Sequence, residues 1–152
     1  MGMFNAIDIA ASGMTAERLR LDVVSNNLAN VNTTRTENGT PYRRQIVVFE
    51  PREDFESVLQ TNINKDNSQG ARIDQVGQGV RARAIIEDQS PFRAVYEPGH
   101  PDADAQGYVM MPNVNAVAEM IDMLSASKAY EANVAAVNAA KSMALKALDI
   151  GK

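Results

Sequence analysis

The sequence contains no cysteine and no tryptophan, and its aromatic side chains are limited to four Tyr and four Phe in 152 residues. Without Cys, the chain can form neither a disulfide framework nor a thiolate metal site, so cysteine usage leaves the redox compartment open. Few large side chains are available for a thick core. Eight Met and many Ala instead suit closely packed helices, because small residues let backbones approach and Met fills irregular gaps. This composition favours helical seams over a deep pocket.

An excess of basic residues is also missing, since 15 Lys and Arg stand against 19 Asp and Glu for a net charge of −4. Binding to nucleic acid requires concentrated positive charge, so no nucleic-acid partner is expected. No run approaches the roughly 20 apolar residues of a membrane span. Asn5 and Asp8 interrupt the N-terminal apolar stretch, which lacks a basic segment, so no cleaved secretion signal is expected either. Composition alone predicts a cytoplasmic chain with one domain.

Residues 3–31 carry apolar side chains spaced alternately by four and three, which is the heptad pattern of a helix packed along a seam. The helix is expected to end near Asn30, where a run of Ser, Asn and Thr side chains competes for backbone hydrogen bonds. Gly13 costs this helix roughly 1 kcal/mol relative to Ala, so packing has to supply the difference. Glu17 is the polar member of a seam whose predicted assembly residues are Met3, Ile7, Ala10, Met14, Leu21, Val24 and Leu28.

A second heptad pattern runs from Asn113, the predicted N-cap, to about Asp149 without Gly or Pro, and Gly151 is expected to end it. Eleven Ala between residues 116 and 147 give this segment high helix propensity. Its predicted assembly residues are Met120, Met123, Ala126, Tyr130, Asn133, Val134, Val137, Ala140, Ala144 and Leu148.

The segment between the helices is rich in turn signals and short β patterns. Strands are expected over 42–49, 81–86 and 92–96, with an extended segment at 108–111 and an irregular surface loop at about 51–79. The predicted fold is α+β, mainly α, with long terminal helices packing as a coiled-coil-like pair or bundle and a small β-rich module between them. The expected parts are an N-terminal assembly helix over 1–32, the β module over 33–112 and a C-terminal assembly helix over 113–152.

Candidate chemistry is sparse. A divalent metal could be held by His100 and Asp102, which makes a small metal-dependent enzyme a remote alternative, but Pro101 explains that segment more simply as a rigid turn. No Gly-rich loop opens a helix as phosphate binding requires. We therefore expect no catalytic residue, no metal and no cofactor. The positive charges of the β module are interpreted as a solvated face, with intersubunit ion pairs as the alternative; they are Arg43, Arg44, Arg72, Arg81 and Arg83.

Periodicity leaves two readings of the seams open. The helices can pack on each other as an intramolecular hairpin, or they can bind neighbouring subunits. The second helix is longer than the first, so a pair with a small β module leaves apolar stripes uncovered, and such stripes usually mark partners. Identical neighbours would allow open, head-to-tail assembly.

The N-terminal helix also carries a motif beyond its heptad spacing. It consists of Ser25, Asn26, Asn27, Leu28, Ala29 and Asn30, preceded by residues 11–14 and followed by Thr33 and Thr34. This motif resembles the one shared by flagellar rod and hook proteins. Within that superfamily, the segments that resemble the FlgC family of proximal rod proteins are 41–44, 95–101, 107–109, 111–114, 129–133 and 141–143.

The resemblance implies a structural subunit of the flagellar basal body that assembles helically through its terminal helices and transmits torque for swimming. Its implied partners are copies of itself, other proximal and distal rod proteins, basal-body ring and junction proteins, and the flagellar type III export apparatus. The implied location is the periplasmic rod, reached without a cleaved signal, which reverses the cytoplasmic expectation. A distal rod or hook subunit is the alternative within the superfamily, although those relatives carry larger β domains.

Overall fold

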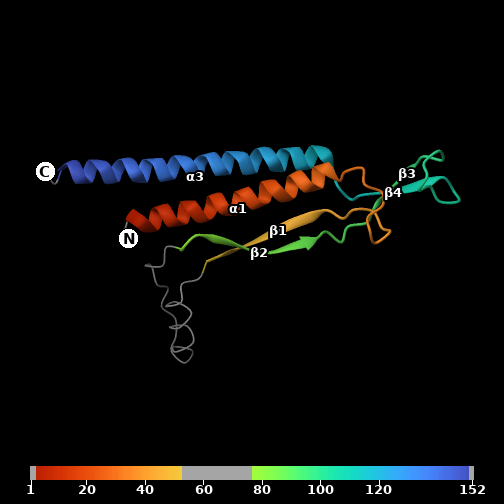
Figure 1. Cartoon of the computed structure of the whole chain (residues 1–152), viewed down its shortest axis with the longest axis horizontal. Coiled ribbons are helices and arrows are strands. Elements are labelled where there is room, and N and C mark those ends of the chain that lie inside the picture. Colours follow the sequence, from red (N-terminus) through yellow and green to blue (C-terminus); the bar gives the residue numbers. More distant parts are fainter. Residues whose placement is uncertain (1–2, 53–76, 151–152) are drawn as a thin grey trace, which may run out of the picture.

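The computed structural model of the chain describes residues 3–52 and 77–150, with side chains described for 4–52 and 77–149. Most of the loop predicted at 51–79, together with Arg72, Gly151 and the side chain of Met3, lies outside the described residues. Two long helices, α1 (Met3–Ala29) and α3 (Ala116–Ile150), lie side by side and run antiparallel (Figure 1). The prediction of a mainly helical α+β fold with long terminal helices is confirmed.

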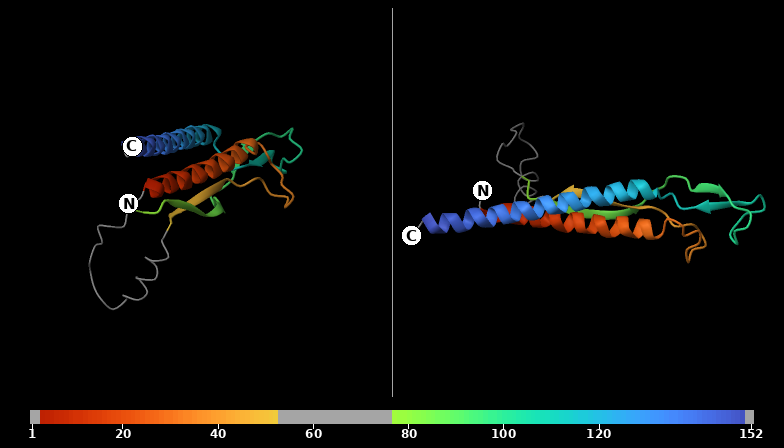
Figure 2. Two further views of the ribbon diagram at one scale, coloured as in Figure 1. Left: turned by 60° about the vertical axis from the view of Figure 1, so that its left-hand side comes forward. Right: turned by 90° about the horizontal axis from the view of Figure 1, so that it is seen from above.

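The strands form two separate antiparallel ribbons. β1 (Gln45–Pro51) pairs with β2 (Val80–Glu87), and β3 (Arg93–Tyr96) pairs with β4 (Tyr108–Met111). The β1–β2 ribbon lies along α1 on the side away from α3, so that α1 is the middle of three layers (Figures 1 and 2). The β3–β4 ribbon projects beyond the end of the helix pair where α1 ends and α3 begins.

Small side chains fill the space between the two helices. Ala10 and Val24 of α1 and Ala126 and Ala140 of α3 are all at most 6% exposed. Gly13 lies opposite Asn133, and a Cβ atom at position 13 would lie 2.8 Å from the Asn133 Nδ2 atom. Gly13 has low helix propensity, but its lack of a side chain lets the Asn133 side chain of α3 approach the α1 backbone.

The start of α3 differs from the prediction. The helix begins at Ala116, and Asn115 is its cap, because the Asn115 Oδ1 atom accepts hydrogen bonds from the amides of Val117 at 3.0 Å and Ala118 at 3.3 Å. The prediction that Asn113 caps the helix is wrong. The Asn113 side chain instead joins two other segments, as described below. The strands are close to their predicted positions, although β1 begins three residues later than expected, at Gln45.

Candidate assembly surface and the polar cluster behind it

A cluster of polar side chains joins α1, β1 and α3 where the two helices meet the β module. At its centre is Asn27, which is completely buried. Its amide donates hydrogen bonds to the Gln45 carbonyl at 2.9 Å and to Glu119 Oε2 at 3.0 Å. Its Oδ1 atom accepts from the Gln45 amide and from the Tyr42 hydroxyl, each at 2.9 Å. Asn27, on α1, therefore uses its full capacity for hydrogen bonding on α3, β1 and the segment that precedes β1.

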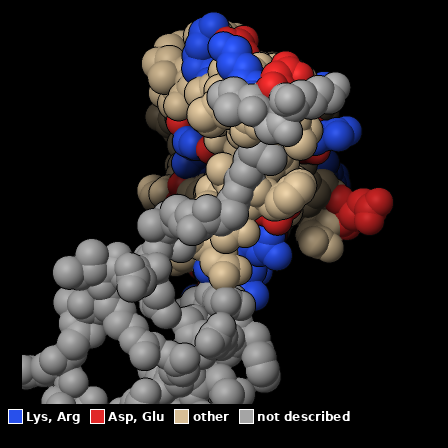
Figure 3. Space-filling model, turned by 90° about the vertical axis from the view of Figure 1, so that its left-hand side faces the viewer, with Lys and Arg blue, Asp and Glu red and all other residues tan. Residues whose placement is uncertain are grey.

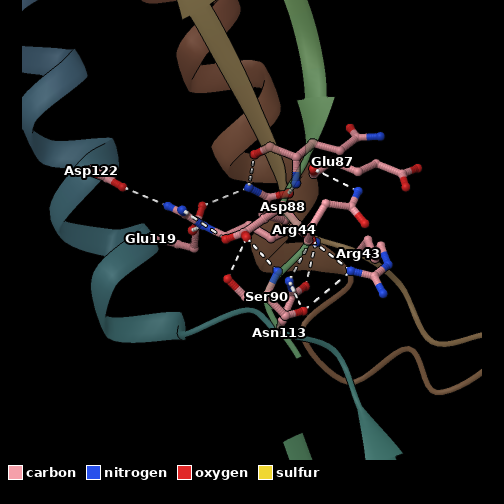
Figure 4. Close-up of polar contacts among 11 residues, drawn as sticks. Arg43, Arg44, Glu87, Asp88, Ser90, Asn113, Glu119 and Asp122 are labelled. Carbon is pink, nitrogen blue, oxygen red and sulfur yellow. Dashed lines mark hydrogen bonds and ion pairs between the residues drawn. The ribbon is translucent and has the colours of Figure 1, made fainter. Parts of the chain in front are cut away.

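Glu119 is also completely buried, and its charge is balanced by Arg44. The Arg44 Nε atom donates to Glu119 Oε1 at 2.6 Å, and a second guanidinium nitrogen donates to Asp122 Oδ2 at 3.2 Å (Figure 4). A buried carboxylate that loses its partner destabilises a protein by about 3–5 kcal/mol. The interpretation of Arg44 as part of a solvated face is wrong, because it makes an intramolecular ion pair with α3.

The same cluster fixes the segment after β2. The Asn113 Oδ1 atom accepts from the Arg44 amide at 2.8 Å, and its Nδ2 atom donates to the Asp88 carbonyl at 3.0 Å (Figure 4). Hydrogen bonds from the Ser90 hydroxyl and amide lower the pKa of Asp88 below its usual value, with help from the charges of Arg44 and Arg43. Burial raises the pKa of Tyr42, and the negative charges of Glu119 and Glu87 raise it further. Tyr42 thus remains a hydrogen-bond donor to Asn27.

A second contact holds the β1–β2 ribbon against α1. The Ser12 hydroxyl donates to the Ile9 carbonyl at 2.7 Å and accepts from the Val80 amide at 3.1 Å. Gly79 precedes Val80 with a φ of 101°, and a Cβ atom there would overlap the Ser12 hydroxyl. Gly79 is therefore the point where the ribbon meets the helix, and only glycine fits there without strain.

The motif over residues 25–30 contributes mainly to these intramolecular contacts. Asn27 holds the cluster, while Asn30 donates to the Asn26 carbonyl at 2.9 Å and accepts from the Thr33 hydroxyl at 3.1 Å where α1 ends. Ser25, Asn26 and Ala29 are exposed. In the sequence, the one indication of this cluster is Asn27, a polar residue next to the apolar seam. The sequence does not reveal its partners, because they lie as many as 92 residues away.

The face of α3 that points away from α1 is apolar and exposed at its N-terminal half. Val117, Met120, Ile121 and Leu124 are between 51% and 66% exposed. Their spacing of three, four and seven residues puts them on one side of the helix. We call these four residues the outer stripe. Met120 is among the predicted assembly residues, whereas Val117, Ile121 and Leu124 are not, although the same spacing places them on this face.

The structure divides the predicted seam residues into two groups. The buried ones face the partner helix within the chain and are Ala10, Val24, Ala126 and Ala140. The half-buried ones, among them Asn133 opposite Gly13, are Ile7, Met14, Leu21, Leu28, Met123, Asn133, Val134, Val137 and Ala144. Met120, Tyr130 and Leu148 are exposed, at 51%, 37% and 71%. An intramolecular hairpin therefore exists, and it leaves apolar surface uncovered.

The alternative of a metal site at His100 is not favoured by the contacts of its residues. The His100 Nδ1 atom accepts a hydrogen bond from the Asp102 amide at 3.1 Å, so the ring stabilises its own turn. The Asp102 carboxylate accepts from the Thr34 hydroxyl at 2.8 Å and lies 3.9 Å from the Arg35 guanidinium. Within residues 3–52 and 77–150, no group of three or more His, Cys, Asp or Glu side chains could hold a metal ion.

None of the helices in this part of the chain combines the length and apolar character needed to cross a membrane.

Comparison with known proteins identifies relatives along the whole chain. Residues 7–35 match the family model described as Flagella basal body rod protein, and residues 105–150 match the model described as Flagellar basal body rod FlgEFG protein C-terminal. The flagellar basal-body rod protein FlgC of Borreliella burgdorferi is 48% identical over 99% of this chain and 98% of its own length. The proteins of the same description from Bacillus subtilis and Escherichia coli O6:H1 are 47% and 43% identical, each over all of both chains.

Proposed function

Because the chain belongs to the FlgC family of flagellar basal-body rod proteins, we propose that it joins its neighbours in the rod through the exposed apolar surfaces of its terminal helices. As a member of this family it is a structural subunit of the proximal rod, where it assembles with other rod proteins. The resemblance that its motif indicated is thereby confirmed. The curated relatives are structural rod proteins, which accords with a chain that serves mechanically.

The outer stripe is the observation that carries the proposal. Its four apolar side chains make up one face of α3 opposite the side that packs on α1. If a neighbour covered about 200–300 Å² of apolar surface there, the gain would be roughly 5–8 kcal/mol before the cost of association. Several neighbours around each subunit multiply this gain. The predicted seam residues that are half-buried, such as Leu21 and Val137, would extend the same contact along the flanks of the helix pair.

A charge in the outer stripe tests this proposal better than one in the intramolecular seam. Leu124 is 66% exposed, so Leu124→Asp should leave the melting temperature of the isolated subunit within a few degrees of the parent. In a strain from which the gene for this subunit has been deleted, the variant should fail to restore swimming, and basal bodies should lack complete rods. The matched control is Ser125→Asp, which adds the same charge at the next exposed position and should restore swimming. Normal motility with Leu124→Asp would contradict the proposal.

The finer assignments of partners follow from the same reading. We propose that distal rod proteins and basal-body ring and junction proteins are neighbours besides copies of this chain. The three parts over 1–32, 33–112 and 113–152 would then divide the work, with the helices joining subunits and the β module distinguishing the proximal rod from other axial parts. Subunit-specific labelling of intact basal bodies tests the position, and labelling in the hook would favour the alternative of a hook subunit.

We also propose that the chain reaches the rod through the flagellar type III export apparatus without a cleaved signal. Support comes from α1, whose Ser12 and Gly13 contact β2 and α3, so removal of a leader from this region would remove contacts of the fold. The intact mass of the subunit recovered from basal bodies checks this. A mass that lacks the first turns of α1 would overturn it.

A further inference from the structure

The β3–β4 ribbon has an apolar face that stays largely exposed, and the hollow beside Tyr108 and Met110 on this face is also lined by Thr34, Arg35 and Pro41. Val95 and Val109 pair across the ribbon and point to one face, where Val109 is only 1% exposed. The residues that alternate with them point to the opposite face. On that face, Tyr96, Tyr108 and Met110 are 63%, 43% and 50% exposed.

The two tyrosines form a preorganised contact surface. Their rings pack edge to face, with centroids 5.3 Å apart and planes at 65°. Gly107, with a φ of 83°, allows the turn to pass close behind them, because a Cβ atom there would lie 3.0 Å from the Tyr96 ring. Rigid aromatic side chains that lose little entropy are typical anchors of protein interfaces. We call this surface, made of Tyr96, Tyr108 and Met110, the tyrosine face.

The opposite end of the molecule also exposes apolar side chains. Since Asn27 lies opposite Glu119 and Gly13 opposite Asn133, α3 continues past the first residue of α1 (Figure 1). Met143, Leu145 and Leu148 near this end are 63%, 54% and 71% exposed. Their spacing spreads them around the helix rather than along one stripe. A helix end with apolar groups on several sides needs a partner that receives it end-on.

The charges of the two ends are complementary. The turn between β3 and β4 carries Glu97, Asp102 and Asp104, whereas Arg35 lies beside only one of them, at 3.9 Å from Asp102. The end of α3 carries Lys141 and Lys146 against the single Asp149. Figure 3, which views the molecule from this end, shows Lys and Arg groups interspersed with neutral side chains and with Asp and Glu groups. Opposite charges at the rim of an apolar contact fix its orientation and suppress wrong partners.

From these observations we propose that the tyrosine face receives the exposed end of the C-terminal helix of the adjoining rod subunit. The proposal rests on the proposed function and adds to it a contact along the rod, from one end of a subunit to the other. Residues 105–150 match a C-terminal model shared by flagellar basal body rod proteins, so other rod subunits carry a segment of this kind. A contact between different surfaces on successive subunits does not close on itself, as an extended shaft requires.

Site-specific photo-crosslinking in assembled basal bodies tests the proposal. With p-benzoylphenylalanine in place of Tyr96, the crosslinked peptide should come from the last turns of the C-terminal helix of a rod subunit. With the same residue in place of Leu148, the peptide should come from the segment corresponding to β3–β4. The matched control replaces Arg83, an exposed residue of β2, and should give at least tenfold less of either product.

The two crosslinking positions are independent tests. If the variant at one position does not assemble, the variant at the other position still tests the proposal. Crosslinks from both positions to any other segment, or to a ring protein, would overturn the proposal, and so would their absence from rods that contain the variant. This outcome differs from failure of the proposed function. In that case Leu124→Asp would assemble normally, whatever the crosslinks show.

Discussion

Replacing Asn27 by Ala is expected to destabilise the subunit more than any exposed change in the same motif. The substitution removes three neutral hydrogen bonds and one to the carboxylate of Glu119. A neutral bond contributes about 1 kcal/mol and one to a charged group about 1.5–3 kcal/mol. Water can reach the half-buried Tyr42 and Gln45 and recovers part of this loss. We therefore expect a loss of roughly 3–5 kcal/mol in the free energy of unfolding.

Urea unfolding of the isolated subunit, followed by circular dichroism at helical wavelengths, measures this loss directly. For a chain of this length it corresponds to a fall of roughly 6–20 °C in melting temperature. The matched control is Asn26→Ala, because Asn26 is exposed and water can replace its hydrogen bonds, which are 3.1 Å to the Tyr42 hydroxyl, 3.4 Å to Gln45 and 3.1 Å from the Asn30 amide. It should lose less than about 1 kcal/mol. Equal losses in the two variants would refute the reasoning that burial makes Asn27 different.

Two further changes probe the fold at other points. Gly79→Ala should cost about 2–4 kcal/mol, because it adds a clash with Ser12 to the strain of a positive φ, whereas Gly39→Ala, with a φ of 74° and open space around it, should cost only about 1 kcal/mol. Thermal melting of both variants checks this, and similar melting temperatures would show that the Ser12 contact is unimportant. Burial raises the pKa of Tyr42 in the folded protein above its ordinary value of 10.0. The stabilisation that the protonated Tyr42 gives the folded state is therefore fully present below pH 10 and is lost as the pH rises through the pKa of Tyr42 in the folded protein. Melting between pH 8 and pH 11 should therefore show a steeper alkaline loss for the parent than for Tyr42→Phe, and parallel curves would refute the assignment.

The two terminal helices could be predicted because their signals are local and repeated. Heptad spacing over residues 3–31 and eleven Ala over 116–147 indicate helices whatever lies around them. The strands were found for a similar reason, since Gly and Pro separate short runs rich in β-branched residues. The general architecture therefore depended on patterns within single segments.

The exact start of α3 could not be chosen by such patterns. Asn113 and Asn115 are chemically equal candidates for the cap, and the fold uses each for a different purpose. Asn113 is occupied by Arg44 and Asp88, which approach from the β module. Only the tertiary arrangement reveals that Asn115 is the one left to cap the helix.

The polar cluster depended on pairing across long separations. Arg44 and Glu119 are 75 residues apart, so no spacing in the sequence links them. The outer stripe was missed for a different reason. The predicted seam of α3 lies on the side toward α1. An Ala-rich helix has several overlapping apolar rows, and periodicity alone does not show which of them packs within the chain and which stays exposed.

A density map of the assembled rod at side-chain resolution tests the central claim most directly. If the subunit joins its neighbours through the apolar surface that its own fold leaves uncovered, Val117, Met120, Ile121 and Leu124 will be buried against helices of adjoining subunits. A rod in which these four side chains face water, while neighbours meet through polar surfaces elsewhere, would contradict the account.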